Sequence, residues 1–160
     1  MTSPVRFKDP RTSIYAFLDE ILVVCPQCSQ CARIVRQDLD NKDMFAPRRC
    51  VCKHCGFTKD WAEHVYHGWY GDPPRDGYFA FPLWLNTPCC DHVLWAYNRR
   101  HLEFLEGFVS APLRERDYHP QSGWANSSTV SRLPKWIKTA KNREHLLKAI
   151  TRLKARLEMC

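Results

Sequence analysis

The chain has 160 residues, of which 44% are hydrophobic and 12% aromatic, and its formal charge is +7. This length suits one domain or a small module with an extension. No apolar run approaches the roughly 20 residues that span a bilayer, and residues 1–9 lack the apolar core of a signal peptide. These features exclude a membrane protein and favour a soluble, cytoplasmic one.

The positive charge is concentrated near the C-terminus. Residues 132–156 contain nine Lys or Arg side chains and a single acid, Glu144. The rest of the chain is close to neutral, so the basicity belongs to this segment and not to the cysteine-rich part before it.

In chain order, the sequence predicts five segments that together form one compact α+β domain. They are an N-terminal segment (1–20), a zinc ribbon (21–70), a β-hairpin plus helix (71–116), a loop (117–131) and a basic helical segment (132–160). Residues 1–12 carry no periodic pattern and are expected to be loosely attached, while 13–19 favour a short helix.

Strands are predicted from β-branched and alternating stretches. Residues 21–24 and 32–37 lead into and out of the first cysteine pair, and 44–51 and 57–61 flank the second. Farther along, the aromatic stretches 78–85 and 92–97 predict a hairpin joined by a turn at 86–91. Pro82 places the first of these strands at an edge, because proline donates no backbone hydrogen bond.

Two longer helices are predicted after the hairpin. Asn98 suits the N-cap of the first, whose apolar face holds Leu102, Leu105, Phe108 and Val109. A short helix is expected over 133–139, with Pro134 in its first turn. Asn142 suits the N-cap of the last helix, whose apolar stripe is Leu146, Ala149, Ile150, Leu153 and Leu157.

Four cysteines have the spacing of a metal site. Cys25 and Cys28 form one Cys-x-x-Cys pair, and Cys52 and Cys55 form another 23 residues later. Two such turns facing each other present four thiolates to one ion in a tetrahedron, the arrangement of structural zinc. Four thiolates leave no open coordination position, so we expect one Zn²⁺ that supports the fold and does not activate water.

Other cysteines leave alternatives open. Cys31 and Cys50 lie close enough in sequence to replace a ligand, although buried free cysteines are the commoner case. A second metal site is conceivable among His64, His67, Cys89, Cys90 and His92, against the simpler interpretation that Cys89 and Cys90 shape the hairpin turn. The odd number of cysteines and the lack of an export signal favour metal binding in a reducing compartment over a disulfide framework.

The sequences Cys25-Pro26-Gln27-Cys28 and Cys52-Lys53-His54-Cys55-Gly56 resemble the zinc-ribbon superfamily, including the transcription-factor-IIB type. The resemblance covers residues 21–61 and departs from the pattern at Ser29, where the first turn often has Gly. Downstream stretches are similar to a family of small uncharacterised bacterial zinc-ribbon proteins. They include Pro82-Leu83-Trp84-Leu85, Thr87-Pro88-Cys89-Cys90 and Ser131-Arg132-Leu133-Pro134-Lys135-Trp136. This second resemblance implies an architecture, a ribbon with an extension, and does not indicate which activity the protein has.

Nucleic-acid binding is the first functional hypothesis. Phosphates attract clustered Lys and Arg whatever the base sequence, and a Trp can stack on an exposed base. Lys148, Arg152 and Arg156 are expected to project outward together. The full set of candidate residues is Lys135, Trp136, Lys138, Lys141, Arg143, Lys148, Arg152 and Arg156.

The second hypothesis is an adaptor that binds an acidic protein partner, with zinc purely structural. Trp84, Trp95 and Tyr97 of the predicted hairpin would serve either as interface anchors or as core beneath the helices. No catalytic triad, phosphate-cradling loop or open metal site is visible, so we expect a non-catalytic protein without a small-molecule substrate.

Overall fold

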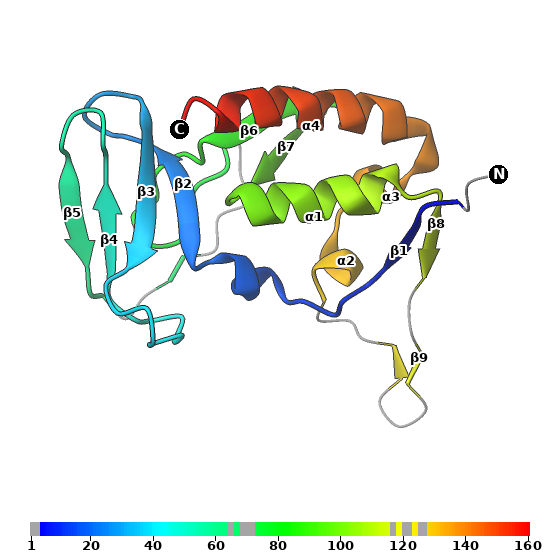
Figure 1. The fold of residues 1–160 in the computed structure, drawn as a ribbon, viewed down its shortest axis with the longest axis horizontal. Coiled ribbons are helices and arrows are strands. Elements are labelled where there is room, and N and C mark those ends of the chain that lie inside the picture. The colour runs from blue at the N-terminus through cyan, green and yellow to red at the C-terminus, as the bar shows by residue number, and fades with distance from the viewer. Residues whose placement is uncertain (1–3, 64–65, 68–72, 116–117, 120–122, 125–127) are drawn as a thin grey trace.

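The computed structural model describes residues 4–63, 66–67, 73–115, 118–119, 123–124 and 128–160. A four-stranded sheet lies at one end, and two helices and a hairpin lie at the other (Figure 1). Among the described residues, no helix combines the length and apolar character needed to cross a membrane. The predicted α+β class, a ribbon extended by a β-hairpin with helices packed on it, is confirmed.

The ribbon sheet is antiparallel throughout, in the order β2-β3-β4-β5. Its strands are β2 (Glu20–Val24), β3 (Cys31–Arg36), β4 (Arg48–Val51) and β5 (Thr58–Trp61). Ile21, Ile34 and Cys50 stand opposite one another across three strands and are fully buried. Since side chains alternate along a strand, this register gives the sheet one buried face.

Backbone hydrogen bonds join the ribbon to the rest of the chain through β2. The N–H of Val24 donates to the carbonyl of Pro82 at 2.8 Å, and that of Trp84 donates to Leu22 at 2.9 Å. The N–H of Leu22 in turn donates to the carbonyl of Tyr97 at 2.8 Å. The outer edge of β2 is thereby covered, so the ribbon is anchored to the hairpin region.

The hairpin is shifted from its predicted position. It consists of β6 (Leu85–Cys89) and β7 (His92–Ala96), joined by a two-residue turn. Residues 78–81 form no strand, because the buried carboxylate of Asp76 accepts the backbone N–H groups of Tyr78, Phe79 and Phe81 at 2.7–2.8 Å. An aspartate that captures nearby N–H groups holds the chain in a turn.

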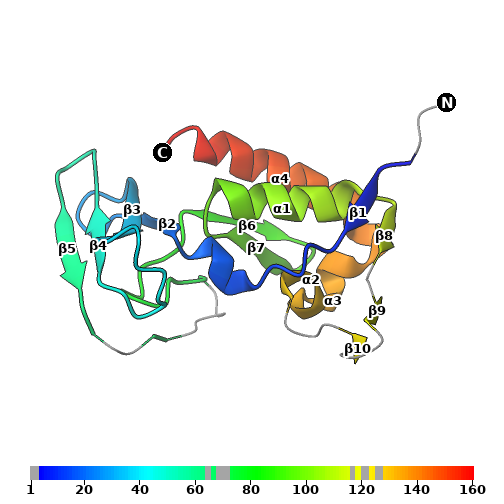
Figure 2. The same ribbon diagram turned by 60° about the horizontal axis from the view of Figure 1, so that its bottom comes forward.

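Helices α1 (Arg99–Ser110) and α4 (Arg143–Leu157) cover the hairpin (Figure 2). The Asn98 side chain accepts the N–H of His101 at 2.9 Å, which confirms this N-cap. All the predicted apolar-stripe residues of both helices are buried. Hydrophobic spacing therefore located both helices correctly.

The predicted cap at Asn142 is wrong. Asn142 has helical backbone angles (φ −89°, ψ −6°) and makes no capping hydrogen bond, because the short helix η2 (Ala140–Asn142) runs directly into α4. Its side chain instead donates to the carbonyl of Trp136 at 2.8 Å. That bond ties the start of α4 to α3 (Lys135–Lys138).

The N-terminal segment is attached more firmly than the sequence predicts. Strand β1 (Arg6–Lys8) pairs in parallel with β8 (Leu113–Glu115). The Phe7 ring packs edge-on against Phe104 and Phe108 of α1, with centroids 5.5 and 5.4 Å apart. Long-range aromatic packing fixes this stretch, which is why no local pattern revealed it.

The remaining elements are short. Helix η1 (Ile14–Phe17) confirms the short helix expected over 13–19. Within the predicted loop 117–131, strands β9 (Tyr118–His119) and β10 (Gly123–Trp124) pair, and α2 (Thr129–Arg132) begins. Ser128 caps α2, and residues 117, 120–122 and 125–127 of that loop lie outside the described residues.

Candidate metal centre and basic cavity

The four predicted ligand cysteines meet at one end of the ribbon sheet. Their sulfur atoms all lie within 4.8 Å of one another. Sγ of Cys25 is 3.7 Å from Sγ of Cys55, and Sγ of Cys28 is 3.6 Å from Sγ of Cys52. A tetrahedron with Zn–S bonds of about 2.3 Å has sulfur separations of about 3.8 Å. The cluster therefore has the size that one zinc ion requires.

The two cysteine turns have matching backbone structures. The N–H of Ser29 donates to the carbonyl of Cys25, and that of Gly56 donates to Cys52, each at 3.0 Å. Ser29 and Gly56 both have positive φ, 63° and 78°. The departure at Ser29 thus leaves the turn geometry unchanged, although a side chain occupies a backbone conformation that favours glycine.

The thiols of the cluster differ in their acidity. Burial disfavours the Cys52 thiolate, but the backbone N–H groups of Cys55 and His54 favour it and bring its pKa down to about 7. The N–H of Gln30 favours the Cys28 thiolate, yet burial and the neighbouring thiols outweigh it and raise that pKa to about 12. Four clustered thiolates repel one another, so a bound cation is what allows all four to ionise.

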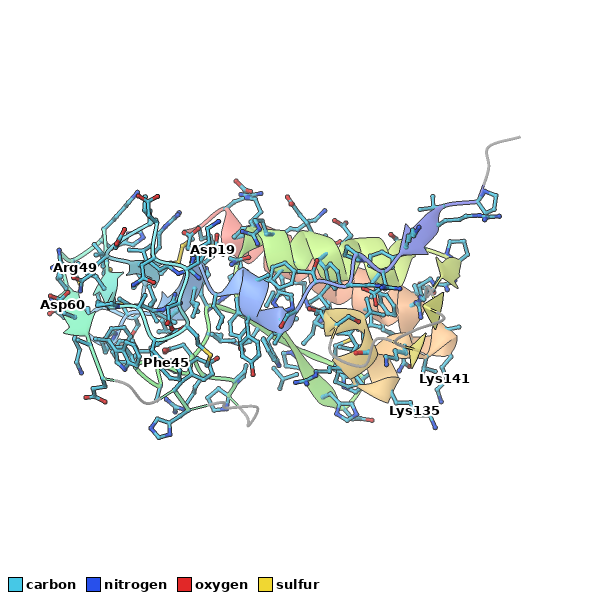
Figure 3. The ribbon with its side chains drawn as sticks, turned by 90° about the horizontal axis from the view of Figure 1, so that it is seen from below. Asp19, Phe45, Arg49, Asp60, Lys135 and Lys141 are labelled. Carbon is cyan, nitrogen blue, oxygen red and sulfur yellow. A yellow bond between two sulfur atoms is a disulfide. The ribbon has the colours of Figure 1, made fainter. Side chains whose placement is uncertain are left out.

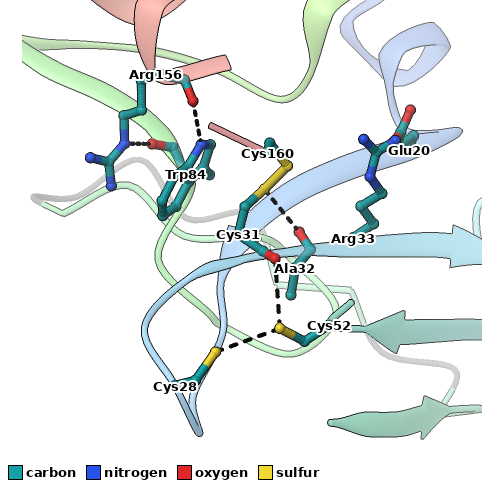
Figure 4. Close-up of a disulfide and its surroundings, with 9 residues drawn as sticks. All are labelled: Glu20, Cys28, Cys31, Ala32, Arg33, Cys52, Trp84, Arg156 and Cys160. Atoms are coloured by element: carbon teal, nitrogen blue, oxygen red, sulfur yellow. Dashed lines mark hydrogen bonds and ion pairs between the residues drawn. A yellow bond between two sulfur atoms is a disulfide. The ribbon is translucent and has the colours of Figure 1, made fainter. Parts of the chain in front are cut away.

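Cys31 is neither a ligand nor a free thiol. It forms a disulfide with Cys160, 129 residues away (Figure 4). The carbonyl of Cys31 lies 3.7 Å from Sγ of Cys52, so the disulfide stands directly beside the four-cysteine cluster. Nothing in the spacing of the cysteines indicated this pairing, and a disulfide is rare in a reducing compartment. It therefore lends no support to the predicted cytoplasmic location.

Cys50 is a buried free thiol within β4. Burial raises its pKa to about 12, so it stays protonated. Its Sγ belongs to no described group of potential ligands. The simpler interpretation of Cys50, as a packed side chain, fits this position.

The second metal site has no geometric counterpart among the described residues. His64 lies outside them, and the only described group of three or more closely spaced potential ligands is the four-cysteine cluster. Cys89 and Cys90 do shape the turn between β6 and β7, as the simpler interpretation predicts.

Most of the basic C-terminal side chains bind the protein itself. The Arg143 guanidinium donates to the carbonyl of Val109, Arg152 to Pro88, and Arg156 to Trp84. Lys138 Nζ donates to the carbonyl of Ser131, and Lys148 forms an exposed ion pair with Glu144 at 3.0 Å. The predicted outward position is therefore wrong for Arg156, which is half-buried against Trp84. Arg152 is exposed, as expected, but its guanidinium also reaches back to the hairpin.

Lys135 and Lys141 differ from these residues. Both are exposed, and they lie at the opposite end of the molecule from Arg49 and Asp60 of the ribbon (Figure 3). They border a shallow cavity of about 770 Å³ that is open to solvent, between the hairpin turn and the start of α4. Its lining is Cys90, Asp91, His92, Lys135, Trp136, Thr139, Lys141, Asn142 and His145.

Two aromatic rings of this lining stack on each other. The indole of Trp136 stacks on the imidazole of His92 with centroids 4.8 Å apart and planes 10° from parallel. Of the described residues in the lining, Asp91 is the single acid, against two lysines. Sequence reasoning missed His92 and His145 as parts of this site, because only tertiary packing brings β7 and α4 together.

No known protein family, curated protein or solved structure matches this chain. The four-cysteine geometry is compatible with a zinc ribbon, while the specific superfamily named from the sequence stays a prediction.

Proposed function

We propose that this chain is a non-catalytic zinc protein that contacts nucleic acid through the basic cavity lined by Lys135, Trp136 and Lys141. The observation that carries the proposal is that cavity: about 770 Å³ in volume, bordered by two exposed lysines, with a flat Trp–His stack in its lining. Its volume lies within the roughly 300–1,000 Å³ of protein ligand pockets, and it is open to solvent, so a polymer strand can reach it. Lysines attract phosphates, and an aromatic face accepts a base.

The zinc supports the fold in this proposal. The four sulfurs have tetrathiolate spacing, and they leave no coordination position for a substrate. Zinc binding would join two turns that lie on separate strand pairs, so part of the folding free energy depends on the ion.

The metal proposal predicts one zinc per chain. Cys52→Ser removes a ligand and should abolish zinc binding and lower the thermal midpoint. Cys50→Ser is the matched control, two residues away and buried in the same strand region, and should keep the metal. Elemental analysis decides, and zinc retained in Cys52→Ser but lost in Cys50→Ser would refute the ligand assignment.

The nucleic-acid proposal predicts a steep salt dependence. Each lysine that neutralises a phosphate contributes about one unit to the slope of log K against log salt. Lys135→Glu and Lys141→Glu should each weaken binding to mixed-sequence DNA and RNA and reduce that slope. Fluorescence anisotropy at several salt concentrations measures both quantities.

Lys42→Glu is the control for this experiment. It makes the same change of charge on an exposed ribbon residue that is not part of the cavity. Equal losses in Lys42→Glu and Lys141→Glu would assign the effect to net charge and contradict the cavity. A wild type that binds neither polymer at low salt would remove nucleic acid altogether.

The adaptor hypothesis has less support. Trp84, one of its expected anchors, is only 3% exposed and belongs to the core beneath α4. Trp95 is half-buried and packs against Tyr97 and His101.

A further inference from the structure

The turn between β6 and β7 has an unusual backbone for its residues. Cys90 and Asp91 both have left-handed φ angles, 53° and 61°. Two-residue hairpin turns with two positive φ angles favour Asn-Gly, since Gly and Asn adopt that conformation with less strain than most residues. Strained backbone of this kind is concentrated at functional sites.

This backbone brings two adjacent thiols together. Consecutive side chains of a regular strand point to opposite faces, yet Sγ of Cys89 and Sγ of Cys90 are only 3.5 Å apart. That separation is close to the 3.6 and 3.7 Å across the four-cysteine cluster. The pair is therefore spaced for two sulfurs to bind the same atom.

The pair is also reachable from solvent. Cys89 is buried against the helices, whereas Cys90 is half-buried and lines the cavity described above. Burial and the neighbouring Cys90 thiol raise the pKa of Cys89 to about 11, and the Arg152 guanidinium opposes that shift. This guanidinium is held beside the end of β6, because it donates to Thr87 Oγ1 at 3.2 Å and to the carbonyl of Pro88 at 2.9 Å. Cys89 therefore meets a ligand as a thiol, with the Arg152 guanidinium close by to favour its loss of a proton on binding.

The number of available ligand atoms decides which metal or metalloid this pair can bind. No third Cys, His, Asp or Glu among the described residues lies close enough to complete a group with this pair. Zinc requires about four ligands, so it does not suit the site. A soft centre that forms two bonds to sulfur and carries its own third ligand does suit it.

We propose that Cys89 and Cys90 form a dithiol site that binds trivalent arsenic. Arsenous acid reacts with both thiols, two As–S bonds replace two As–O bonds, and two water molecules leave. The arsenic stays trivalent and keeps one hydroxyl group, which faces the cavity. No oxidant or reductant is needed.

Phenylarsine oxide is the probe, because its single arsenic loses one oxygen as water and bridges two thiols. Titration of the zinc-loaded full chain, followed by native mass spectrometry, should show one adduct per chain with zinc retained. Cys90→Asn should weaken binding by roughly 100-fold or more, since the second bond of a linked pair forms at a high effective concentration. Asparagine tolerates the left-handed conformation, so this variant keeps the turn.

Two control variants test whether phenylarsine oxide binding depends on the dithiol, on the strained backbone of the turn or on a buried thiol elsewhere in the chain. Asp91→Gly relaxes the same turn but leaves both thiols in place, and Cys50→Ser removes a buried thiol of the ribbon. Both should bind phenylarsine oxide like the wild type. The proposal is overturned by a wild type without an adduct, by unchanged affinity in Cys90→Asn, or by an adduct that forms only as zinc is released.

Discussion

At the scale of single residues, His101 illustrates what burial does to a titratable group. It is 3% exposed, stacks on Phe17, and its Nδ1 accepts the N–H of Tyr97 at 3.1 Å. Burial lowers the pKa of this imidazole from 6.5 to about 3. The folded state therefore requires neutral His101.

His101 should make stability depend on pH. The unfolded chain binds this proton more tightly than the folded one. The contribution of His101 to the unfolding free energy is therefore fully present above pH 6.5 and is lost as the pH falls toward 3. The expected slope approaches about 1.4 kcal/mol per pH unit. Urea unfolding between about pH 7 and pH 4 measures it.

His101→Asn is the comparison for that experiment, because its side-chain oxygen can accept the same N–H without titrating. The difference in stability between wild type and this variant should shrink steadily below pH 6.5. The matched change His67→Asn is made at an exposed histidine and should leave the profile unchanged. Parallel profiles for wild type and His101→Asn would contradict the assignment.

At the scale of elements, α4 and the start of the hairpin are joined by a reciprocal contact. The indole N–H of Trp84 donates to the carbonyl of Arg156 at 3.0 Å, and the Arg156 side chain donates back to the carbonyl of Trp84. The same guanidinium lies 4.0 Å from the Trp84 ring. Removing either side chain leaves polar groups of its partner without these hydrogen bonds.

Trp84→Ala should lower the unfolding free energy by about 3–5 kcal/mol, as large aromatic truncations in a core do. Trp95→Ala should cost less, because Trp95 is only half-buried. Denaturant unfolding of both variants tests the order. Similar small losses would indicate that these tryptophans face a partner and not the core.

At the scale of the whole molecule, the Cys31–Cys160 disulfide joins the ribbon to the end of α4 across 129 residues. Cross-links that close long loops restrict the unfolded chain strongly, by about 4.7 kcal/mol for a loop of roughly 100 residues. The same link places Cys160 beside the four-cysteine cluster (Figure 4).

Cys160→Ser should therefore lower the unfolding free energy by about 3–5 kcal/mol while zinc stays bound. A phosphine reductant should destabilise the wild type to the same extent and leave Cys160→Ser unaffected. Thermal unfolding with parallel zinc analysis measures both. Equal midpoints for wild type with and without reductant would show that the disulfide does not contribute.

Local chemistry in the sequence determined several features correctly. Cys25, Cys28, Cys52 and Cys55 form one cluster, as the sequence predicts, because two-residue spacing fits a tight turn. Helical periodicity predicts the apolar stripe of α4. The need to satisfy N–H groups at a helix start predicts Asn98 as the N-cap of α1.

Tertiary structure decided what depends on distant partners. Two local features escaped the sequence as well: Asp76 accepts N–H groups two to five residues ahead and keeps residues 78–81 out of the hairpin, and η2 runs into α4 at Asn142. Arg152 and Arg156 turned to carbonyls 64 and 72 residues away, and Cys31 found its partner at Cys160. Such pairings leave no periodic signal, because each depends on which groups the folded chain leaves unsatisfied and close in space.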